Sequence, residues 1–459
     1  GSACTISQDG DVFFTGVCTA TTLTGAASGL TGALPAISGA NLTNLPAANL
    51  TGALPAISGA NLTGIAATDN VRTGILDVAG IATFRDTVNI PNINGGQIGG
   101  RRNLIINGAM NVAQRGTSST SSGFYTVDRF KVTFSGTDEA PTQAQVDVAS
   151  GTTPYTLGFR KALKITNGNQ TSGTGADDYI LVRTSLEAQD IANSGWNYTS
   201  TSSYITLSFW IKSSVAQNFH GHIRAHDGSN YNYPFETGSL SADTWTKVTK
   251  TIPGNSNLTF DNNANAGLAI NFAAFFGTNY TSGVSNDEWI NYAAANLTPD
   301  QTSTWYTTND ATLELTGVQL EVGSQVTPFE HRSYGEELSL CQRYYYQHDP
   351  ENSGGTDSFC WAGKGAGGSG VDFNFILPRP LRASPTIALE DGGGGNTRAT
   401  INATNGTSTS NNTPTVSGFN THYNVICLRQ TGHSGMTDNV VSMVSLSSSG
   451  VYLTFSAEL

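Results

Sequence analysis

Charged side chains are scarce in this chain. Asp, Glu, Lys and Arg make up 12% of its 459 residues, about half the fraction usual in soluble globular proteins. The formal net charge is -12, so the chain lacks the basic surface that nucleic acids and anionic membranes attract. We therefore expect no nucleic-acid partner.

The chain also has few cysteines and no long apolar run. The five cysteines are an odd number at irregular spacing, which fits neither a disulfide framework nor a zinc site, and we expect mostly buried thiols at Cys4, Cys18, Cys341, Cys360 and Cys427. The longest largely apolar stretch, Ala266 to Phe276, is too short to cross a bilayer. No signal peptide is recognisable, and we expect no membrane insertion. Because the sequence begins Gly1-Ser2 and not with Met, we expect it to be a fragment of a longer protein.

Serine, threonine, asparagine and glycine take the place of the missing charges. Disorder normally accompanies high net charge and few aromatics, whereas this chain has 20 Phe, 16 Tyr and 6 Trp from which to build cores. Its length suits about three domains. The composition predicts a folded chain that is rich in β-structure.

One fourteen-residue stretch, LTGALPAISGANLT, occurs twice, from Leu30 and again from Leu50. The apolar residues from Leu30 to Ile65 follow neither a strand period nor a helix period, and Pro35, Pro46 and Pro55 would each remove a helical hydrogen bond. Two copies are too few for a solenoid. A loose linker has no reason to keep Leu and Ile in register. We therefore predict a thread of three chains around one axis, and so a homotrimer.

Beyond Asn103 the pattern changes to short strands separated by turn residues, which is typical of a β-sandwich. In YITLSFWIKSS, one face carries the apolar residues and is predicted to be core, whereas the other is largely polar; the apolar residues are Ile205, Leu207, Phe209 and Ile211. In ATLELTGVQLEV the apolar alternation slips by one residue after Leu315, so Gly317 is predicted to form a β-bulge.

A short amphipathic helix is predicted in GEELSLCQRYYYQ, where Leu338, Cys341 and Tyr345 share a face. We expect this helix to connect two β-domains. Farther on, VDFNFIL alternates like a strand, with Val371, Phe373 and Phe375 on its apolar face. A terminal hairpin is predicted from strands at 441–446 and 451–455, joined through 447–450.

These segments resemble a module of tail-fibre proteins from tailed bacteriophages. The resemblance is carried by NLIINGAMNVAQRG, YTVDRF, SFWIKSS, GVQLEVGSQVTPFEHR and EELSLCQRYYYQ, in that order. ANLTGIAAT and GIATFRDTVNIPNINGGQIGGRRNLIINGAMN are most similar to stretches in phages of marine cyanobacteria. The likeness runs from about Ala40 to Tyr346 and is looser beyond, where LPRPLRASPTIAL and the final AEL resemble fibre-tip domains.

The resemblance implies an extracellular, virion-borne homotrimeric fibre. Its N-terminal side would bind a tail or baseplate protein and its C-terminal end would face the host, with a middle jelly roll similar to carbohydrate-binding domains. The expected fold is mainly β, with an extended intertwined shaft, a jelly-roll-like β-sandwich, a short connecting helix and a C-terminal β-sandwich tip. The expected boundaries are 1–29 for an N-terminal β segment, 30–102 for the shaft, 103–334 for the jelly roll, 335–347 for the helical connector and 348–459 for the tip.

Tail proteins of this kind either bind glycans or cut them. Glycan hydrolysis needs two carboxylates on a rigid site, but the adjacent acidic pairs here would point to opposite faces of a strand. No GxSxG, HExxH or Walker motif occurs, and no lysine or strand-to-helix context accompanies GGGGN at 392–396. We expect no enzymatic activity and no cofactor.

The stretch HGHIRAHD places His220 and His222 on one face of a strand. Three such pairs on a threefold axis would offer six imidazoles to a metal, and some phage fibres use HxH in this way, as repeated copies along a narrow shaft. This chain has a single copy within the predicted sandwich. We expect exposed strand histidines and no metal.

Sugar recognition needs aromatic faces with amides and carboxylates nearby. Trp210 and Trp245 lie in predicted strands and are expected to serve packing. Aromatic and histidine side chains in turn-rich or Gly/Ser/Asn-rich sequence are the receptor-binding candidates, namely Trp289, Tyr292, Trp305, Tyr306, Trp361, His422, Tyr423 and His433.

The resemblance, together with the long, weakly charged, β-rich chain, implies a non-enzymatic tail-fibre adhesin that attaches to a host-surface receptor, either a glycan such as lipopolysaccharide or an outer-membrane protein. Two alternatives stay open: a tail-associated glycan depolymerase, and a structural connector whose tip binds another virion protein.

Overall fold

The computed structural model describes residues 4–14, 101–348, 359–366, 370–391, 399–403, 408–411, 415–421, 425–431, 438–446 and 451–459. The chain divides into two compact units, Gly1–Arg85 and Asp86–Leu459. In the first unit β1 (Cys4–Ile6) pairs antiparallel with β2 (Val12–Phe14). Up to residue 100 the predicted shaft lies outside the described residues, and the three-chain thread stays a prediction.

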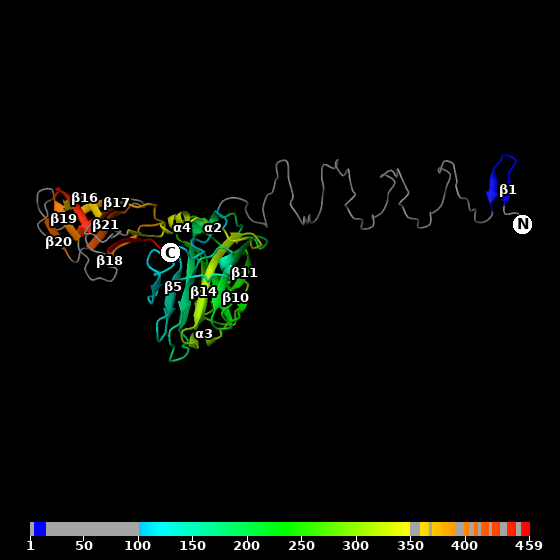
Figure 1. Ribbon diagram of the computed structural model, residues 1–459, viewed down its shortest axis with the longest axis horizontal. Helices are drawn as coiled ribbons and strands as arrows, with labels where there is room; N and C mark the ends of the chain where they lie inside the picture. The colour runs from blue at the N-terminus through cyan, green and yellow to red at the C-terminus, as the bar shows by residue number, and fades with distance from the viewer. Residues whose placement is uncertain are drawn as a thin grey trace. The chain divides into compact units, whose positions relative to one another are not determined.

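Two six-stranded antiparallel sheets form a jelly-roll-like β-sandwich in the second unit, with long strands of both sheets running side by side (Figure 1). The first sheet has the order β13 (Ile290–Asn291), β10 (Tyr231–Ser239), β9 (Asn218–Ala225), β12 (Ala266–Phe276), β7 (Tyr179–Glu187) and β4 (Lys131–Ser135). The second has the order β11 (Thr246–Pro253), β8 (Tyr204–Ser213), β14 (Thr312–Val322), β6 (Lys161–Thr166), β5 (Thr142–Asp147) and β3 (Ser118–Ser119).

The main core lies between these sheets. Phe209 of β8 meets Phe272 of β12 edge to face, with ring centroids 4.9 Å apart. The predicted apolar face of β8 is confirmed, because all four of its residues are buried: Ile205, Leu207, Phe209 and Ile211. The opposite face is polar as expected, but Thr206 and Ser208 on it are also buried. Thr206 donates to the carbonyl of Gly323, just beyond β14, where the chain leaves the sheet.

Gly317 interrupts β14 as the sequence predicts. The register between β14 and β8 shifts between Thr316 and Gln319, and Gly317 has φ +63°. A left-handed conformation of this kind favours glycine because it lacks a Cβ. The bulge lets Leu315 and Val318, whose spacing is odd, both remain in the core.

Within the described part of the chain, four short helices accompany the strands: α1 (Thr153–Thr156), α2 (Ala188–Ala192), α3 (Thr304–Thr307) and α4 (Tyr334–Cys341). In Figure 1, α2 and α4 lie at one end of the sandwich and α3 at the other. The α4 helix is the predicted one, and it begins where the hydroxyl of Ser333 accepts a hydrogen bond from the amide of Glu336. It ends sooner than predicted, because Tyr345 already belongs to a strand.

Strands beyond α4 form two further sheets. A three-stranded sheet has the order β15 (Tyr345–His348), β24 (Val451–Ser456) and β18 (Thr386–Asp391). A seven-stranded sheet has the order β20 (Ser408–Asn411), β19 (Ala399–Ala403), β23 (Val441–Leu446), β16 (Phe359–Ala366), β17 (Gly370–Ile376), β22 (Val425–Thr431) and β21 (Thr415–Thr421).

The two sheets share one apolar core. The predicted alternation of β17 is confirmed, since Val371, Phe373 and Phe375 are buried, and Phe375 stacks on Phe455 of β24 at 4.8 Å. The predicted terminal hairpin is wrong. Both of its strands exist, but β23 pairs with β16 and β19, whereas β24 pairs with β15 and β18. Their alternation predicted strands correctly, but pairing depended on partners distant in the sequence.

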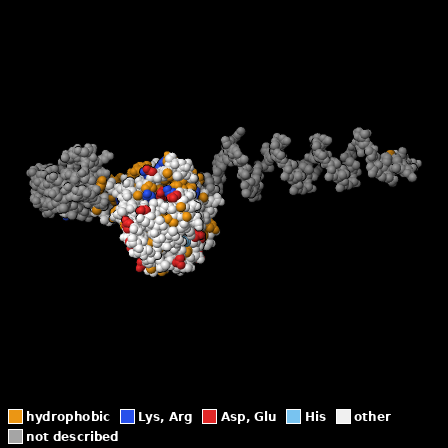
Figure 2. Space-filling model, turned by 60° about the horizontal axis from the view of Figure 1, so that its bottom comes forward, with side chains coloured by type: hydrophobic (Ala, Val, Ile, Leu, Met, Phe, Trp, Pro, Cys, Tyr) orange, Lys and Arg blue, Asp and Glu red, His pale blue; other side chains and the backbone are white. Residues whose placement is uncertain are grey.

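On the visible surface of the sandwich, acidic and basic side chains are few and scattered, and hydrophobic side chains lie among backbone and uncharged groups (Figure 2). Of the cysteines whose side chains are described, Cys341 is buried and Cys427 is half-buried, both as free thiols. Within the described ranges, no helix is long and apolar enough to cross a bilayer.

Candidate functional site

A pocket opens on the outer face of the second sheet, the face turned away from the main core. Its floor is formed by Ser208 and Trp210 of β8 and by Lys247 of β11. Lys247 is paired directly with Trp210 across the two strands. Because side chains alternate along a strand, these residues point outward while Leu207 and Phe209 point into the core.

The chain that follows β14 forms the wall of this pocket. Residues 326–329 and His331 line it, opposite the sheet. Two buried side chains of β14 hold the wall in place. The carboxylate of Glu321 accepts hydrogen bonds from the amide and the hydroxyl of Thr327, at 2.9 and 2.5 Å, and the side-chain oxygen of Gln319 accepts one from the amide of Glu330 at 2.8 Å. The pocket is therefore built into the fold.

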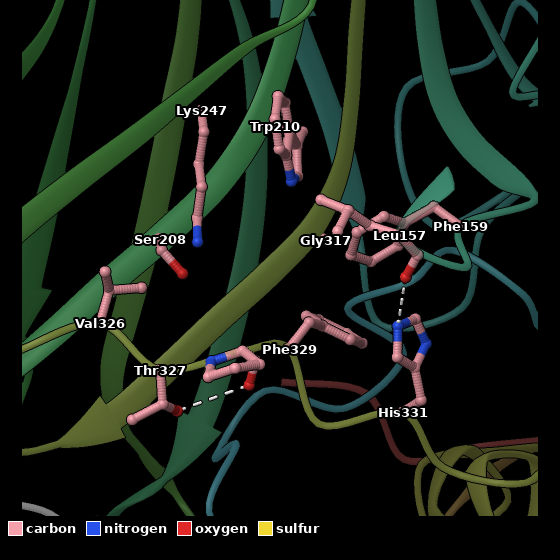
Figure 3. Close-up of a pocket in the computed structure, with 11 residues that line it drawn as sticks. Leu157, Phe159, Ser208, Trp210, Lys247, Gly317, Val326, Thr327, Phe329 and His331 are labelled. Carbon is pink, nitrogen blue, oxygen red and sulfur yellow. Dashed lines mark hydrogen bonds between the residues drawn. The ribbon is translucent and has the colours of Figure 1, made fainter. Parts of the chain in front are cut away.

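Three rings close one end of the pocket. Phe159 meets Phe329 edge to face at 4.9 Å, and the His331 ring lies 5.2 Å from Phe159 and 4.9 Å from Phe329. A ring nitrogen of His331 is 2.9 Å from the carbonyl oxygen of Leu157, which fixes the imidazole (Figure 3). Gly158 has φ +98°, and a Cβ at this position would lie 3.1 Å from the His331 imidazole. Glycine therefore avoids a close contact with this ring.

The bulge at Gly317 gives the pocket its depth. A Cβ on Gly317 would lie 2.7 Å from the Phe159 ring and 3.1 Å from the Trp210 ring. Real Cβ atoms essentially never come as close as 2.7 Å to another atom, a contact of 3.1 Å is already tight, and the positive φ adds strain to any substitution. The missing side chain therefore lets both rings reach the cavity.

The pocket combines an aromatic face with hydrogen-bonding groups. Its volume is about 380 Å³, within the range of small-ligand sites. Figure 3 shows the Trp210 indole nitrogen, the Ser208 hydroxyl and the Lys247 ammonium directed into the same space. Stacking on ring C–H surfaces together with such donors suits a sugar unit. None of the residues lining this pocket is an Asp or a Glu.

Two of the predicted receptor-binding residues are core residues. Trp305 and Tyr306 are 0% and 1% exposed. The Trp305 indole nitrogen donates to the Thr312 carbonyl, and the Tyr306 hydroxyl donates to the Asp178 carboxylate. Their polar atoms are paired and their faces are covered, so the prediction that they contact a receptor is wrong. A polar, turn-rich sequence around α3 concealed the apolar face that this helix buries.

The other candidates in that part of the chain are half-buried. Trp289 donates to the Pro253 carbonyl at 2.8 Å and packs 5.2 Å from the Tyr233 ring. Tyr292 carries the Arg224 guanidinium 3.6 Å above its ring. Neither residue lines the pocket at Trp210. Trp361 lies in β16, and His422, Tyr423 and His433 fall outside the described residues.

The HxH pair is buried, contrary to the expectation of exposed histidines. His220 and His222 are 8% and 1% exposed. Burial, reinforced by the nearby charges of Arg183 and Arg224, lowers the pKa of His222 to about 3. Phe276 packs beside this histidine, with ring centroids 6.0 Å apart. The described residues contain no group of three or more potential ligands suited to a metal ion.

Trp210 is the residue that sequence reasoning assigned to packing instead of binding. It does contact apolar neighbours, since it packs against a small cluster around Phe159 on the outer face. The alternation of β8 already indicates that Trp210 faces outward, where it lines the pocket. Trp210 shares the polar register of Thr206, Ser208 and Lys212, which points away from the main core.

Comparisons with known proteins give matches among solved structures alone. No protein-family model matches the sequence, and no curated protein matches it. The enzymatically active domain of tailspike protein 4 from bacteriophage CBA120 matches at 11% identity and a TM-score of 0.26, covering 48% of this chain and 21% of the tailspike chain. The matched part is thus a small fraction of that longer protein.

Two smaller proteins are matched over nearly their whole length. A xylan-binding domain from Paenibacillus barcinonensis Xyn10C matches at 10% identity and a TM-score of 0.25, covering 51% of this chain and 100% of that one. A putative sugar binding protein from Bacteroides thetaiotaomicron matches at 13% identity and a TM-score of 0.25, covering 48% and 99%. At such identities and TM-scores, the function of this chain has to be inferred from its own residues.

Proposed function

We propose that this chain is a non-enzymatic glycan-binding adhesin of a phage tail fibre, and that the pocket at Trp210 holds a sugar unit of a host-surface glycan such as lipopolysaccharide. The observation that carries the proposal is the pocket itself. An aromatic face, a hydroxyl and an ammonium converge there, and buried hydrogen bonds hold the wall rigid. Its preformed wall keeps the entropic cost of ordering the site on binding low.

The composition of the pocket favours binding over cleavage. Glycoside hydrolysis canonically uses two carboxylates, one acting as acid and the other as base or nucleophile. The residues that line this pocket include no carboxylate. Lys247 is exposed at the pocket and takes part in none of the ion pairs of the described residues. Its charge favours a glycan that carries acidic groups.

The binding experiment uses the full chain and purified host-surface polysaccharide, with affinity measured by calorimetry or tryptophan fluorescence. Trp210→Ala should weaken binding at least tenfold, equivalent to about 1.4 kcal/mol. Tyr334→Ala is the matched control, because this aromatic residue is 60% exposed but belongs to α4 and does not line the pocket. Unchanged affinity of the Trp210 variant would refute the assignment of the pocket.

The same incubation separates adhesin from depolymerase. An adhesin leaves the polysaccharide intact, whereas a depolymerase releases reducing ends or oligosaccharides. A connector would bind virions and fail to bind host cells. A third measurement is light scattering of the purified chain, for which we propose a trimer; a monomer at micromolar concentration would remove the basis of the shaft prediction.

A further inference from the structure

The outer face of the first sheet carries an unusual set of polar side chains. Along β9, every second residue points to this face, because Phe219, Ile223 and Ala225 point into the core. Cross-strand pairing sets His222 beside Asn271 of β12, and Asn271 beside Arg183 of β7. Arg224 lies two residues farther along β9, beside the small side chain of Ala269.

Arg183 and Arg224 therefore lie on the same face, on two strands that flank β12, and neither has an acidic partner among the described residues. Neither Arg183 nor Arg224 takes part in an ion pair within the described residues. Arg183 uses its Nε to donate to the Asn271 side-chain oxygen at 2.7 Å. Burial lowers the pKa of Arg183, and the charge of Arg224 adds to this effect.

Several nitrogen atoms on this face are buried and lack a hydrogen bond. They belong to three successive outward side chains that begin on β9: Nδ1 of His222, Nε of Arg224 and Nε2 of His226. His222 is 1% exposed. Buried polar atoms in folded proteins are nearly always paired with protein, water or an ion. The Nε of Arg224 can only donate, so this run of unpaired nitrogen atoms beside two cations favours an acceptor at this place.

The charge of the cluster specifies that acceptor. Burial lowers the pKa values of His222 to about 3 and of His226 to about 4, so both imidazoles are neutral at pH 7. The net charge is therefore that of the two arginines. The Tyr292 ring lies 3.6 Å from the Arg224 guanidinium carbon and orients this group. Stacking of this kind leaves the in-plane N–H groups available for bidentate bonds to an oxyanion.

We propose that Arg183 and Arg224 form a binding site for an oxyanion, the carboxylate, sulfate or phosphate group of a ligand, on the outer face of the first sheet. This site lies on the other sheet from the Trp210 pocket and shares no residue with it. It stands or fails independently of glycan binding at that pocket.

The test titrates the full chain with sodium acetate, sulfate or phosphate at constant ionic strength and measures binding by calorimetry and by the shift of the unfolding midpoint. At least one anion should bind to the wild-type chain. Arg183→Gln and Arg224→Gln should each weaken that binding at least tenfold. The comparison among the three anions distinguishes a carboxylate from a sulfate or phosphate ligand.

Two control variants exclude general salt effects. Arg160 also stacks on a tyrosine, Tyr155 at 4.0 Å, but its Nη1 donates to backbone carbonyls, so Arg160→Gln should bind the anion within twofold of wild type. Lys161→Gln should do the same, because Lys161 lies on β6 in the other sheet and pairs with Asp147. If a glutamine variant does not fold, Arg183→Lys or Arg224→Lys replaces it. Each lysine keeps the positive charge but loses the planar guanidinium that forms bidentate hydrogen bonds, so anion binding should still weaken. Binding of none of the anions, unchanged binding by both arginine variants, or equal loss of binding in Arg160→Gln or Lys161→Gln would overturn the proposal.

Discussion

Glu187 and Arg343 form a bidentate ion pair, in which the arginine Nε and Nη2 donate to the two carboxylate oxygens at 2.7 and 2.8 Å. The pair joins the end of β7 to the chain just after α4. The Tyr344 hydroxyl donates to the same carboxylate at 2.7 Å. Burial raises the pKa of Glu187, but the hydrogen bonds from Arg343 and Tyr344 outweigh it and hold this pKa below its ordinary value.

Arg343→Met should lower the free energy of unfolding, because it leaves a carboxylate that is 0% exposed without its cation. We expect a loss of about 3 kcal/mol, the low end for a broken buried pair, since the Arg343 side chain is 34% exposed. Urea unfolding of the full chain measures it. Arg429→Met is the control: Arg429 also binds Asp372 through two bonds, but its side chain is 44% exposed, and the loss should be much smaller. Equal losses in the two variants would contradict the role of burial.

Gly317→Ala should destabilise the sandwich and weaken glycan binding together. The new Cβ would collide with the Phe159 and Trp210 rings, and alanine is strained at φ +63°. We expect a loss of about 1–3 kcal/mol in unfolding free energy. Gly173→Ala is the control, because Gly173 also has a positive φ but has open space around it. Wild-type affinity in Gly317→Ala would show that the bulge does not shape the site.

His222 should make the chain less stable in acid. The unfolded state takes up a proton on this residue as the pH falls through about 6.5, whereas burial holds the folded pKa near 3. Between these values the unfolded state binds more protons, so the free energy of unfolding falls as the pH falls, by up to about 1.4 kcal/mol per pH unit. His222→Asn should flatten the curve between pH 6 and pH 4.

Asp128 acts in the opposite direction, because burial raises its pKa to about 6 and the folded state gains a proton there. This contribution is the same in wild type and in His222→Asn, so it cancels in their difference. Parallel stability curves for the two proteins would show that His222 does not carry the effect.

Trp305→Ala should damage folding instead of binding. This side chain is 0% exposed, and large-to-small changes at such aromatic positions cost about 3–5 kcal/mol. Trp289→Ala should cost less, because Trp289 is only partly buried against the core. Thermal unfolding ranks the two variants. Glycan affinity equal to wild type is expected for any folded fraction of either variant.

Glu458→Gln should loosen the attachment of the final residues to the sandwich. The Glu458 carboxylate binds Arg129 and lies 3.2 Å from Arg115, and the Arg129 side chain is 2% exposed. Leaving that cation unpaired should cost about 3 kcal/mol. Asp147→Asn, at the exposed pair with Lys161, should cost less than about 1 kcal/mol. Denaturant unfolding compares them, and the reverse order would contradict the argument.

Local patterns in the sequence predicted the elements well. The alternation in β8 and β17 placed Phe209 and Phe375 in cores, and the slip of register around Gly317 predicted its bulge. The predicted helix is α4, which begins at a serine cap. These features depend on residues within a few positions of one another, so the sequence alone contains the information.

Tertiary structure decided which aromatic side chains meet solvent and which do not. The alternation of side chains along β8 shows that Trp210 points away from the main core. The pocket around it also needs residues 326–329 and His331, which lie far along the chain. Trp305 has polar neighbours in sequence and is nevertheless fully buried. The same holds for Arg183 and Arg224, which share one face of the sheet because β7 and β9 both pair with β12. By itself, then, the sequence determined the strands, the bulge and the helix, because hydrophobic period and backbone preference act locally. The pocket and the paired arginines arose only in the tertiary structure, because they depend on which distant segments cover and adjoin each face.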